Sequence, residues 1–247
     1  MFVMLRKIGD YVILMGQALR RPPKFAIFRR QLVHEFYSLG VTSFLIVAIL
    51  SVFVGAVAAI LVAYNIDNPL LPDLMIGFVT RQMVIQEFSP TIICIILAGK
   101  LGSQIASELG TMRVTQQIDA LQVMGINAAN YLIMPKIIAC LLFIPVLIIF
   151  SIFLGIYGGY VACDVLNIIS TEDYVLGLRS WFDPWTVTFA LIKTVVFSFI
   201  IASVSSFIGY NVNGGSVEVG KASTDGVVYS SILIIFFDLI LTQMLLS

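Results

Sequence analysis

The chain has 247 residues, of which 60 % are hydrophobic and 11 % are charged, and its formal net charge at pH 7 is zero. A mean hydropathy of +1.03 and several apolar runs of ~20 residues indicate an all-α integral membrane protein, rather than a barrel of short alternating strands. The balanced charge gives no indication of nucleic-acid binding. Three cysteines, an odd number, do not indicate a disulfide framework.

Residues 1–40 are predicted to form a helical segment that lies on the membrane surface. This segment is too polar to cross a bilayer, because it contains half of the fourteen Lys and Arg residues of the chain. These basic residues are Arg6, Lys7, Arg20, Arg21, Lys24, Arg29 and Arg30.

Five apolar runs follow, and each is long enough to cross the hydrocarbon core of a bilayer as an α-helix. No repeat, low-complexity tract or soluble domain interrupts them, so residues 1–247 are predicted to form a single domain. The predicted spans are approximately residues 41–63, 87–106, 137–162, 185–209 and 226–246.

The distribution of Lys and Arg predicts the orientation of these spans. If the N-terminus is cytoplasmic, eleven of the fourteen basic residues lie in segments on the cytoplasmic side. Arg81 and Arg179 then lie in outer loops, and Lys193 lies within the fourth span. Cytoplasmic loops of membrane proteins carry an excess of Lys and Arg. The N-terminus is therefore predicted to be cytoplasmic and the C-terminus to lie outside.

The most polar helix-like stretch, SELGTMRVTQQIDALQVMGIN (107–127), lies between the second and third spans, on the predicted cytoplasmic side. Residues 108–125 are predicted to form one amphipathic helix, with Ser107 as its N-cap and Gly125 at its C-terminal end. Such a helix either docks in a partner's groove or lies in the lipid headgroups, and the small number of Lys and Arg residues favours docking. Its narrow apolar stripe consists of Val114, Ile118 and Leu121.

Lys193 and Asp238 lie inside predicted spans, where each charge costs roughly 2.5–3.5 kcal/mol. Counting residues from the outer ends of the two spans puts both side chains ~12–14 Å below the outer surface. Glu87 lies near the same leaflet. Two interpretations stay open. Lys193 and Asp238 form a structural ion pair, or all three side chains line an outward-facing pocket that binds a lipid headgroup.

Small residues recur in the first and third predicted spans, where they permit close contact between helices. Packing within one chain and packing at a dimer interface both agree with this pattern. The small residues are Ser51, Gly55 and Ala59 in the first span and Gly155, Gly158 and Gly159 in the third.

The segment GSVEVGKA (215–222) has the spacing of a phosphate-binding loop but ends in Ala222, where that motif needs Ser or Thr to bind Mg²⁺. A membrane span precedes it in place of a buried strand, and the single histidine, His34, is interpreted as a surface or packing residue. The chain is therefore expected to bind no cofactor or metal and to catalyse no reaction. Any energy source for its function is expected to be another polypeptide.

Three segments resemble the MlaE/YrbE family of ABC transporter permeases, which transport lipids and are associated with MCE proteins. They are EFYSLGVTSFLIV (35–47), ELGTMRVTQQIDALQVMGIN (108–127) and LIKTVVF (191–197), within a resemblance that extends from about residue 30 to residue 243. It implies a five-span permease of the bacterial inner membrane with an N-terminal interfacial helix. It further implies a homodimer, two cytoplasmic ATPase subunits that bind ATP and Mg²⁺, a periplasmic MCE protein, and phospholipid as the substrate.

The resemblance also implies roles for individual residues. Residues 108–125 would be the coupling helix, through which the ATPase moves the spans, while Glu87, Lys193 and Asp238 would line the lipid pocket. Gln86 stands where some relatives carry arginine, so contacts with the headgroup are expected to differ there. The residues expected to couple to the ATPase are Glu108, Arg113, Gln117, Asp119 and Gly125.

Two other functions agree with part of the sequence. A proton-coupled secondary transporter could use Glu87, Lys193 and Asp238 as a relay, but such folds usually have paired internal repeats, and this chain has none. A membrane anchor that transports nothing would explain Lys193 and Asp238 only as a structural pair. The predicted function is therefore that of a lipid-transporting permease subunit.

Overall fold

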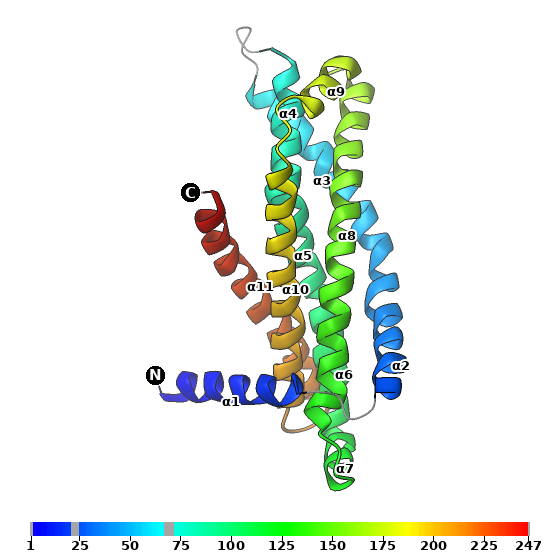
Figure 1. Cartoon of the computed structure of the whole chain (residues 1–247), viewed down its shortest axis with the longest axis vertical. Helices are drawn as coiled ribbons and strands as arrows, with labels where there is room; N and C mark the ends of the chain where they lie inside the picture. Colours follow the sequence, from blue (N-terminus) through cyan, green and yellow to red (C-terminus); the bar gives the residue numbers. More distant parts are fainter. Residues whose placement is uncertain (1, 21–24, 67–71, 247) are drawn as a thin grey trace. The chain divides into compact units, whose positions relative to one another are not determined.

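The computed structural model describes residues 2–20, 25–66 and 72–246, and within these ranges the chain is helical and contains no strand (Figure 1). Two of the long helices contain π-helical segments, labelled η. In chain order the elements are α1 (Phe2–Ala18), α2 (Phe25–Glu35), η1 (Phe36–Val41), α3 (Thr42–Asn65), α4 (Leu74–Met83), η2 (Val84–Ile92), α5 (Ile93–Leu97), η3 (Ala98–Gly102), α6 (Ser103–Val114), α7 (Gln117–Val123), α8 (Ala128–Leu166), α9 (Thr171–Arg179), α10 (Pro184–Tyr210) and α11 (Ser216–Leu246).

Five helices in the described part of the chain are long and apolar enough to cross a membrane, which confirms the predicted number. They extend beyond the predicted spans, because hydropathy reports the length of the apolar core and not the point where the backbone stops being helical. The first helix, for example, continues without a break from α2 through η1 into α3. The five helices are Phe28–Asn65, Leu74–Val114, Ala128–Leu166, Pro184–Tyr210 and Ser216–Met244.

The chain forms two compact units, and several helices contribute residues to both. Unit 1 consists of Met1–Thr42, Ile95–Phe143 and Phe197–Phe237, and unit 2 consists of Ser43–Cys94, Ile144–Val196 and Asp238–Ser247. Each unit has its own buried polar contacts, which are described separately below.

In unit 1, α1 is attached to α10 and to the beginning of α8. The Tyr11 hydroxyl donates a hydrogen bond to Ser203 Oγ at 2.8 Å. The buried Asn130 side chain donates to the carbonyl oxygen of Ala18 at 2.7 Å. The last carbonyl groups of a helix have no partner within it, so Asn130 satisfies one that would otherwise remain free. These contacts fix the C-terminal end of α1 on the rest of the unit.

Close helix contacts in unit 1 bring together α6, α10 and α11. A Cβ atom on Gly209 would lie 2.6 Å from the carbonyl oxygen of Ala106, and one on Gly226 would lie 3.2 Å from the Ala106 side chain. The buried Ser205 and Ser230 hydroxyls are 3.3 Å apart and hydrogen-bonded. Small residues therefore allow the backbones to approach closely enough for polar side chains to bond between helices.

In unit 2, α3 and α8 are in direct backbone contact. A Cβ atom on Gly55 would overlap the carbonyl group of Gly155, and one on Gly158 would overlap the backbone of Val52. A buried chain of hydroxyl groups lies beside this contact, in which Ser51 donates to Ser151 at 2.8 Å and Ser151 donates to Ser89 at 3.1 Å. The small residues of the first and third helices therefore serve packing within the chain.

The short helix α9 is held against α4 in unit 2. Its N-cap, Ser170, accepts a hydrogen bond from the Asp173 amide at 3.1 Å. The fully buried Tyr174 hydroxyl donates to the Ile156 carbonyl at 3.3 Å. Burial disfavours the phenolate and raises the pKa of Tyr174, so the hydroxyl keeps the proton that it donates.

Arg81 completes the attachment of α9. Its guanidinium donates to the carbonyl oxygens of Leu178 at 2.5 Å, Ser180 at 3.0 Å and Trp181 at 3.3 Å. These carbonyls end α9 and begin the following loop, where helical partners are missing. Arg81 thus has a structural role, which the sequence presented only as a basic residue of an outer loop.

We predict that Gly55→Ala destabilises the protein, because the added methyl group overlaps the backbone of α8. Overpacking of this kind costs ~1–3 kcal/mol and more where the obstacle is backbone rather than side chain. The measurement is the midpoint of detergent-induced unfolding, followed by circular dichroism.

Gly99→Ala is the matched control, because it also lies within a helix and an added Cβ atom there meets nothing within 4 Å. Equal unfolding midpoints for the two variants would contradict the packing argument.

Candidate functional site

A buried lysine in α10 holds two carboxylates from two other helices. The Lys193 side chain is 0 % exposed, and its Nζ atom lies 2.8 Å from Glu87 Oε1 and 2.7 Å from Asp238 Oδ1. Glu87 belongs to η2 and Asp238 to α11. The sequence-based expectation that Lys193 and Asp238 meet is confirmed, and Glu87 joins the same cluster.

Three further side chains complete this charge cluster and were not predicted. Thr91 Oγ1 donates to Asp238 at 3.0 Å, Thr242 Oγ1 donates to Glu87 at 3.5 Å, and the Lys193 ammonium lies 4.6 Å from the centre of the Phe189 ring. Each of these side chains lies four positions along the chain from a charged residue of the cluster: Thr91 from Glu87, Thr242 from Asp238 and Phe189 from Lys193. That spacing puts side chains on one helix face, and it is the signal that could have identified them.

The cluster has one more carboxylate than ammonium groups. Removing three charges from water is expensive, and the pairing repays the expense only where the geometry is good and the remaining hydrogen-bonding positions are filled. Lys193 fulfils this condition, because its Nζ atom also donates to the backbone carbonyl of Gln86 at 3.3 Å. Glu87, in contrast, is 39 % exposed. The ammonium is therefore enclosed, while an acceptor oxygen of the cluster remains accessible.

Glu87 lies in a widened part of its helix. The π-helical segment η2 contains Pro90, which has no amide hydrogen and cannot continue the regular hydrogen-bond ladder. Single π-turns within α-helices occur frequently at functional sites. The wide turn presents Glu87, and Thr91 one turn later, to Lys193 and Asp238.

The polar stretch after the second long helix forms two helices, α6 and α7, rather than the single helix predicted for residues 108–125. The break is at Gln116, which has a left-handed backbone with φ of +59°. The predicted N-cap at Ser107 is wrong, because Ser107 lies inside α6. The sequence has neither Gly nor Pro at the break, so nothing in the local pattern indicated it.

Gly125, predicted as the C-terminal end of this stretch, lies two residues beyond the last residue of α7. Gly125 has φ of +75°, a conformation that glycine adopts without strain. Its amide donates to the carbonyl of Gln122 at 2.9 Å, and the amide of Ile126 donates to the carbonyl of Leu121 at 3.0 Å. This pair of bonds is a Schellman motif, which satisfies the last carbonyl groups of α7.

Two polar contacts fix α7 within unit 1. Arg113 donates to Asp119 at 2.6 Å, across the break between α6 and α7. Gln122 donates to the hydroxyl of Tyr210, at the end of α10, at 3.1 Å. A force applied to α7 is therefore transmitted to α6 and to α10.

The apolar stripe of α7 faces its own chain. Ile118 is fully buried, and Val114 packs against the buried side chains of Val212 and Val219. The expectation that this stripe fits a partner's groove is therefore wrong for Ile118. The exposed apolar residues are Val123, which is 90 % exposed, and Met124. Gln117 and Asp119 are also exposed.

Glu108 pairs with a lysine at the beginning of α8. Its carboxylate lies 2.7 Å from Lys136 Nζ, which also lies 2.7 Å from Glu35 of α2. The Lys136 side chain is 1 % exposed, and it was not identified as a site residue from the sequence. Glu108 thus joins α6 to α8 within unit 1.

The segment that resembled a phosphate-binding loop is helical. The helix α11 begins at Ser216, so Gly220 and Lys221 lie within it, and Lys221 pairs with Glu218 at 3.5 Å. A search of the described residues finds no group of three His, Cys, Asp or Glu side chains that could hold a metal ion.

Comparison with known proteins gives one consistent family. The family described as permease MlaE matches residues 32–244. A probable ABC transporter permease protein of Rickettsia bellii is 34 % identical over 227 residues, which cover 92 % of this chain and 85 % of the relative. One from Synechocystis sp. is 34 % identical over 230 residues, with coverages of 91 % and 85 %. The Arabidopsis thaliana protein TRIGALACTOSYLDIACYLGLYCEROL 1, chloroplastic, is 32 % identical over 231 residues, with coverages of 94 % and 66 %.

The family match includes both the charge cluster around Lys193 and the paired helices α6 and α7. Together with five apolar helices, it identifies a multi-pass membrane protein and a transport subunit of the ABC type rather than an enzyme. The chain belongs to the MlaE family of permeases.

Proposed function

We propose that this permease moves phospholipid between the inner membrane and a periplasmic MCE carrier, using the energy of a separate ATPase. The observation that carries the proposal is the charge cluster of Lys193, Glu87 and Asp238, which lie on three long helices. Ionisable side chains at such positions are costly and mark the paths of substrates or ions. One relative, from Arabidopsis, has the name of a lipid, trigalactosyldiacylglycerol.

The cluster suits the polar headgroup of a lipid. The exposed oxygen of Glu87 accepts a hydrogen bond from an ammonium or hydroxyl group, while a headgroup phosphate that displaces a carboxylate gains contact with the Lys193 ammonium. Apolar side chains of the surrounding helices accommodate the acyl chains. Substrate binding thus exchanges one set of charged contacts for another, without leaving an unpaired charge in the membrane.

The helix α7 and its C-terminal end are the proposed contact with the ATPase. Gln117, Asp119 and Val123 are exposed there, and Arg113 holds the segment rigidly through its pair with Asp119. The same continuous helix, Leu74–Val114, carries Arg113 near one end and Glu87 nearer the other. ATP binding in the partner would move α7 and α6, and this movement would change the environment of the charge cluster.

The proposed assembly is a homodimer with two cytoplasmic ATPase subunits and a periplasmic MCE protein. The bias of Lys and Arg supports a cytoplasmic N-terminus and a periplasmic C-terminus in the bacterial inner membrane. The helix α1, fixed by Asn130 to the beginning of α8, is proposed to lie in the cytoplasmic membrane interface. ATP and Mg²⁺ would be bound by the partner and not by this chain.

A proton-coupled transporter is the second candidate, because the Lys193 ammonium lies within hydrogen-bonding distance of the carboxylates of both Glu87 and Asp238. Proton coupling predicts transport without the ATPase, at a rate that depends on the proton gradient. Lipid transport by the ABC mechanism predicts no transport without ATP. Reconstitution in vesicles with and without the ATPase separates the two.

We expect Lys193→Ala to reduce both the phospholipid that copurifies with the complex and the stimulation of ATPase activity by lipid. The loss of one charge-assisted contact of about 1.4–3 kcal/mol corresponds to roughly a 10- to 100-fold weaker affinity for lipid. Bound lipid is quantified by mass spectrometry, and ATPase activity is measured in vesicles.

Lys221→Ala is the control, because Lys221 is exposed and pairs only within its own helix. If Lys193→Ala retains lipid occupancy and ATPase stimulation equal to those of this control, the cluster is purely structural.

We expect Val123→Asp to weaken the binding of the ATPase subunit by about tenfold, since a charge then replaces the most exposed apolar side chain of α7. The measurement is the affinity of the purified ATPase for the permease in nanodiscs. Val165→Asp is the matched control. Val165 is also exposed, but it lies near the C-terminal end of α8, whereas α7 precedes the N-terminal end of that helix. Equal affinities of the two variants would show that α7 is not the contact.

A further inference from the structure

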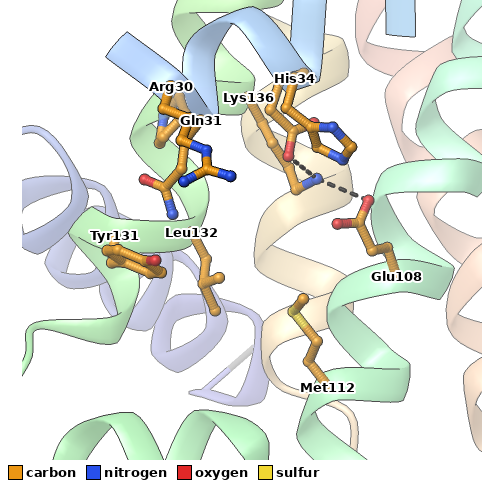
Figure 2. A pocket seen from close by; sticks show the side chains of 10 residues that line it. Arg30, Gln31, His34, Glu108, Met112, Tyr131, Leu132 and Lys136 are labelled. Carbon is orange, nitrogen blue, oxygen red and sulfur yellow. Dashed lines mark hydrogen bonds and ion pairs between the residues drawn. The ribbon is translucent and has the colours of Figure 1, made fainter. Parts of the chain in front are cut away.

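Unit 1 contains a pocket with a volume of about 720 Å³, lined by charged and apolar side chains, that the proposed transport path does not use. It lies between α2, α6 and α8, and Figure 2 shows the side chains that line it. Its lining residues are Arg30, Gln31, His34, Glu35, Glu108, Met112, Tyr131, Leu132, Pro135 and Lys136.

One wall of the pocket carries an accessible carboxylate. Lys136 is enclosed and is shared between Glu35 and Glu108, so two negative charges face one positive charge. The Glu108 side chain is 38 % exposed, and Figure 2 shows it across the pocket from α2. Glu108 therefore retains the capacity to accept a hydrogen bond from a cationic ligand.

The opposite wall carries a cation. Arg30 lines the pocket from α2 and is exposed, and among the residues that the structure describes it forms no ion pair. Figure 2 shows Arg30 and Gln31 extending from α2 into the space above Leu132. A free guanidinium presents several N–H donors in the fork geometry that matches a phosphate group.

The pocket lies at helix ends that reach one membrane surface. It is built from the beginning of the first long helix, the end of the second and the beginning of the third, all within unit 1. The spans of a polytopic membrane protein alternate in direction, so these three helix ends reach the same membrane surface. The helix Ala128–Leu166 is 39 residues long, or about 58 Å, and exceeds a hydrocarbon core of ~30 Å. The helix therefore extends beyond the hydrocarbon core.

We infer that this pocket binds a phosphoethanolamine group, with the phosphate on Arg30 and the ammonium on Glu108. The charged side chains that line it, Arg30 and Lys136 against Glu35 and Glu108, balance when His34 is neutral, so a zwitterion fits better than an anion. An anionic headgroup without an ammonium would meet Arg30 but would be repelled by the spare carboxylate. Met112, Leu132 and Pro135 supply apolar contacts for the adjoining part of a lipid.

The test is photo-crosslinking of the complete transporter in vesicles of equal phosphatidylethanolamine and phosphatidylglycerol content. A photoreactive benzoylphenylalanine replaces Leu132 in the pocket or, as a reference, the exposed Leu142 on the same helix. The ratio of the two lipids in the adducts is measured by mass spectrometry. At Leu132 we expect about tenfold more phosphatidylethanolamine relative to phosphatidylglycerol than at Leu142, as one charge-assisted hydrogen bond provides.

Substitutions make the assignment specific. Glu108→Gln is expected to remove the enrichment, because only phosphatidylethanolamine has an ammonium group for Glu108, and Lys136 keeps Glu35 as its partner. Arg30→Gln is expected to lower the yield of both lipid adducts, because both lipids carry the phosphate. Arg29→Gln is expected to change neither, because Arg29 does not line the pocket. Equal lipid ratios at positions 132 and 142, or an enrichment that survives Glu108→Gln, would overturn the inference. If free phosphoethanolamine, added before irradiation, lowers the yield of the lipid adduct at position 132, the result would support the same headgroup chemistry for a soluble ligand.

The outcome is independent of the proposed transport path. Lys193→Ala alters the charge cluster of unit 2 and is expected to leave the adducts at position 132 unchanged. A loss of enrichment in Lys193→Ala would show that the adduct reports the transported lipid, and would overturn a separate site.

Discussion

Each of the two compact units closes around one lysine ammonium that water does not reach and that two carboxylates hold. In unit 2 it is Lys193, and in unit 1 it is Lys136, and each lysine joins three helices that are distant in the chain. Separating one helix from such a cluster is costly, because it leaves a charged side chain without its partner in an apolar environment. Each cluster has one carboxylate more than ammonium groups, and an exposed carboxylate can exchange its partner for a ligand. The two proposed ligand contacts use Glu87 in unit 2 and Glu108 in unit 1.

Within each unit, several helices meet through close backbone contact. Glycine and serine dominate the contacts of α3 with α8 and of α6 with α10 and α11. Between helices in lipid, apolar burial gives little driving force, so short distances and hydrogen bonds have to supply it. The larger apolar side chains are thereby left for the surface that faces lipid, where many of them are exposed.

The number of membrane-spanning helices could be predicted from the sequence, because the length of an apolar run can be counted. The same counting gave Lys193 and Asp238 a common depth, so that their ion pair was one of the two interpretations left open. The end of α7 near Gly125 followed from local chemistry. The break at Gln116 could not be predicted, since a left-handed glutamine is selected by the packing of α7 on its own chain. The pairing of Glu108 with Lys136 also escaped prediction, because it depends on which faces two separate helices turn to each other.

The contact between α3 and α8 has a consequence for how the permease can move. With the backbone of Gly55 seated on Gly155, any sliding of one helix along the other would drive the side chains of the next turn into a neighbouring main chain. The parts of α3 and α8 that form this contact must therefore move together as a rigid body. Any rearrangement during a working cycle therefore has to leave this contact in place.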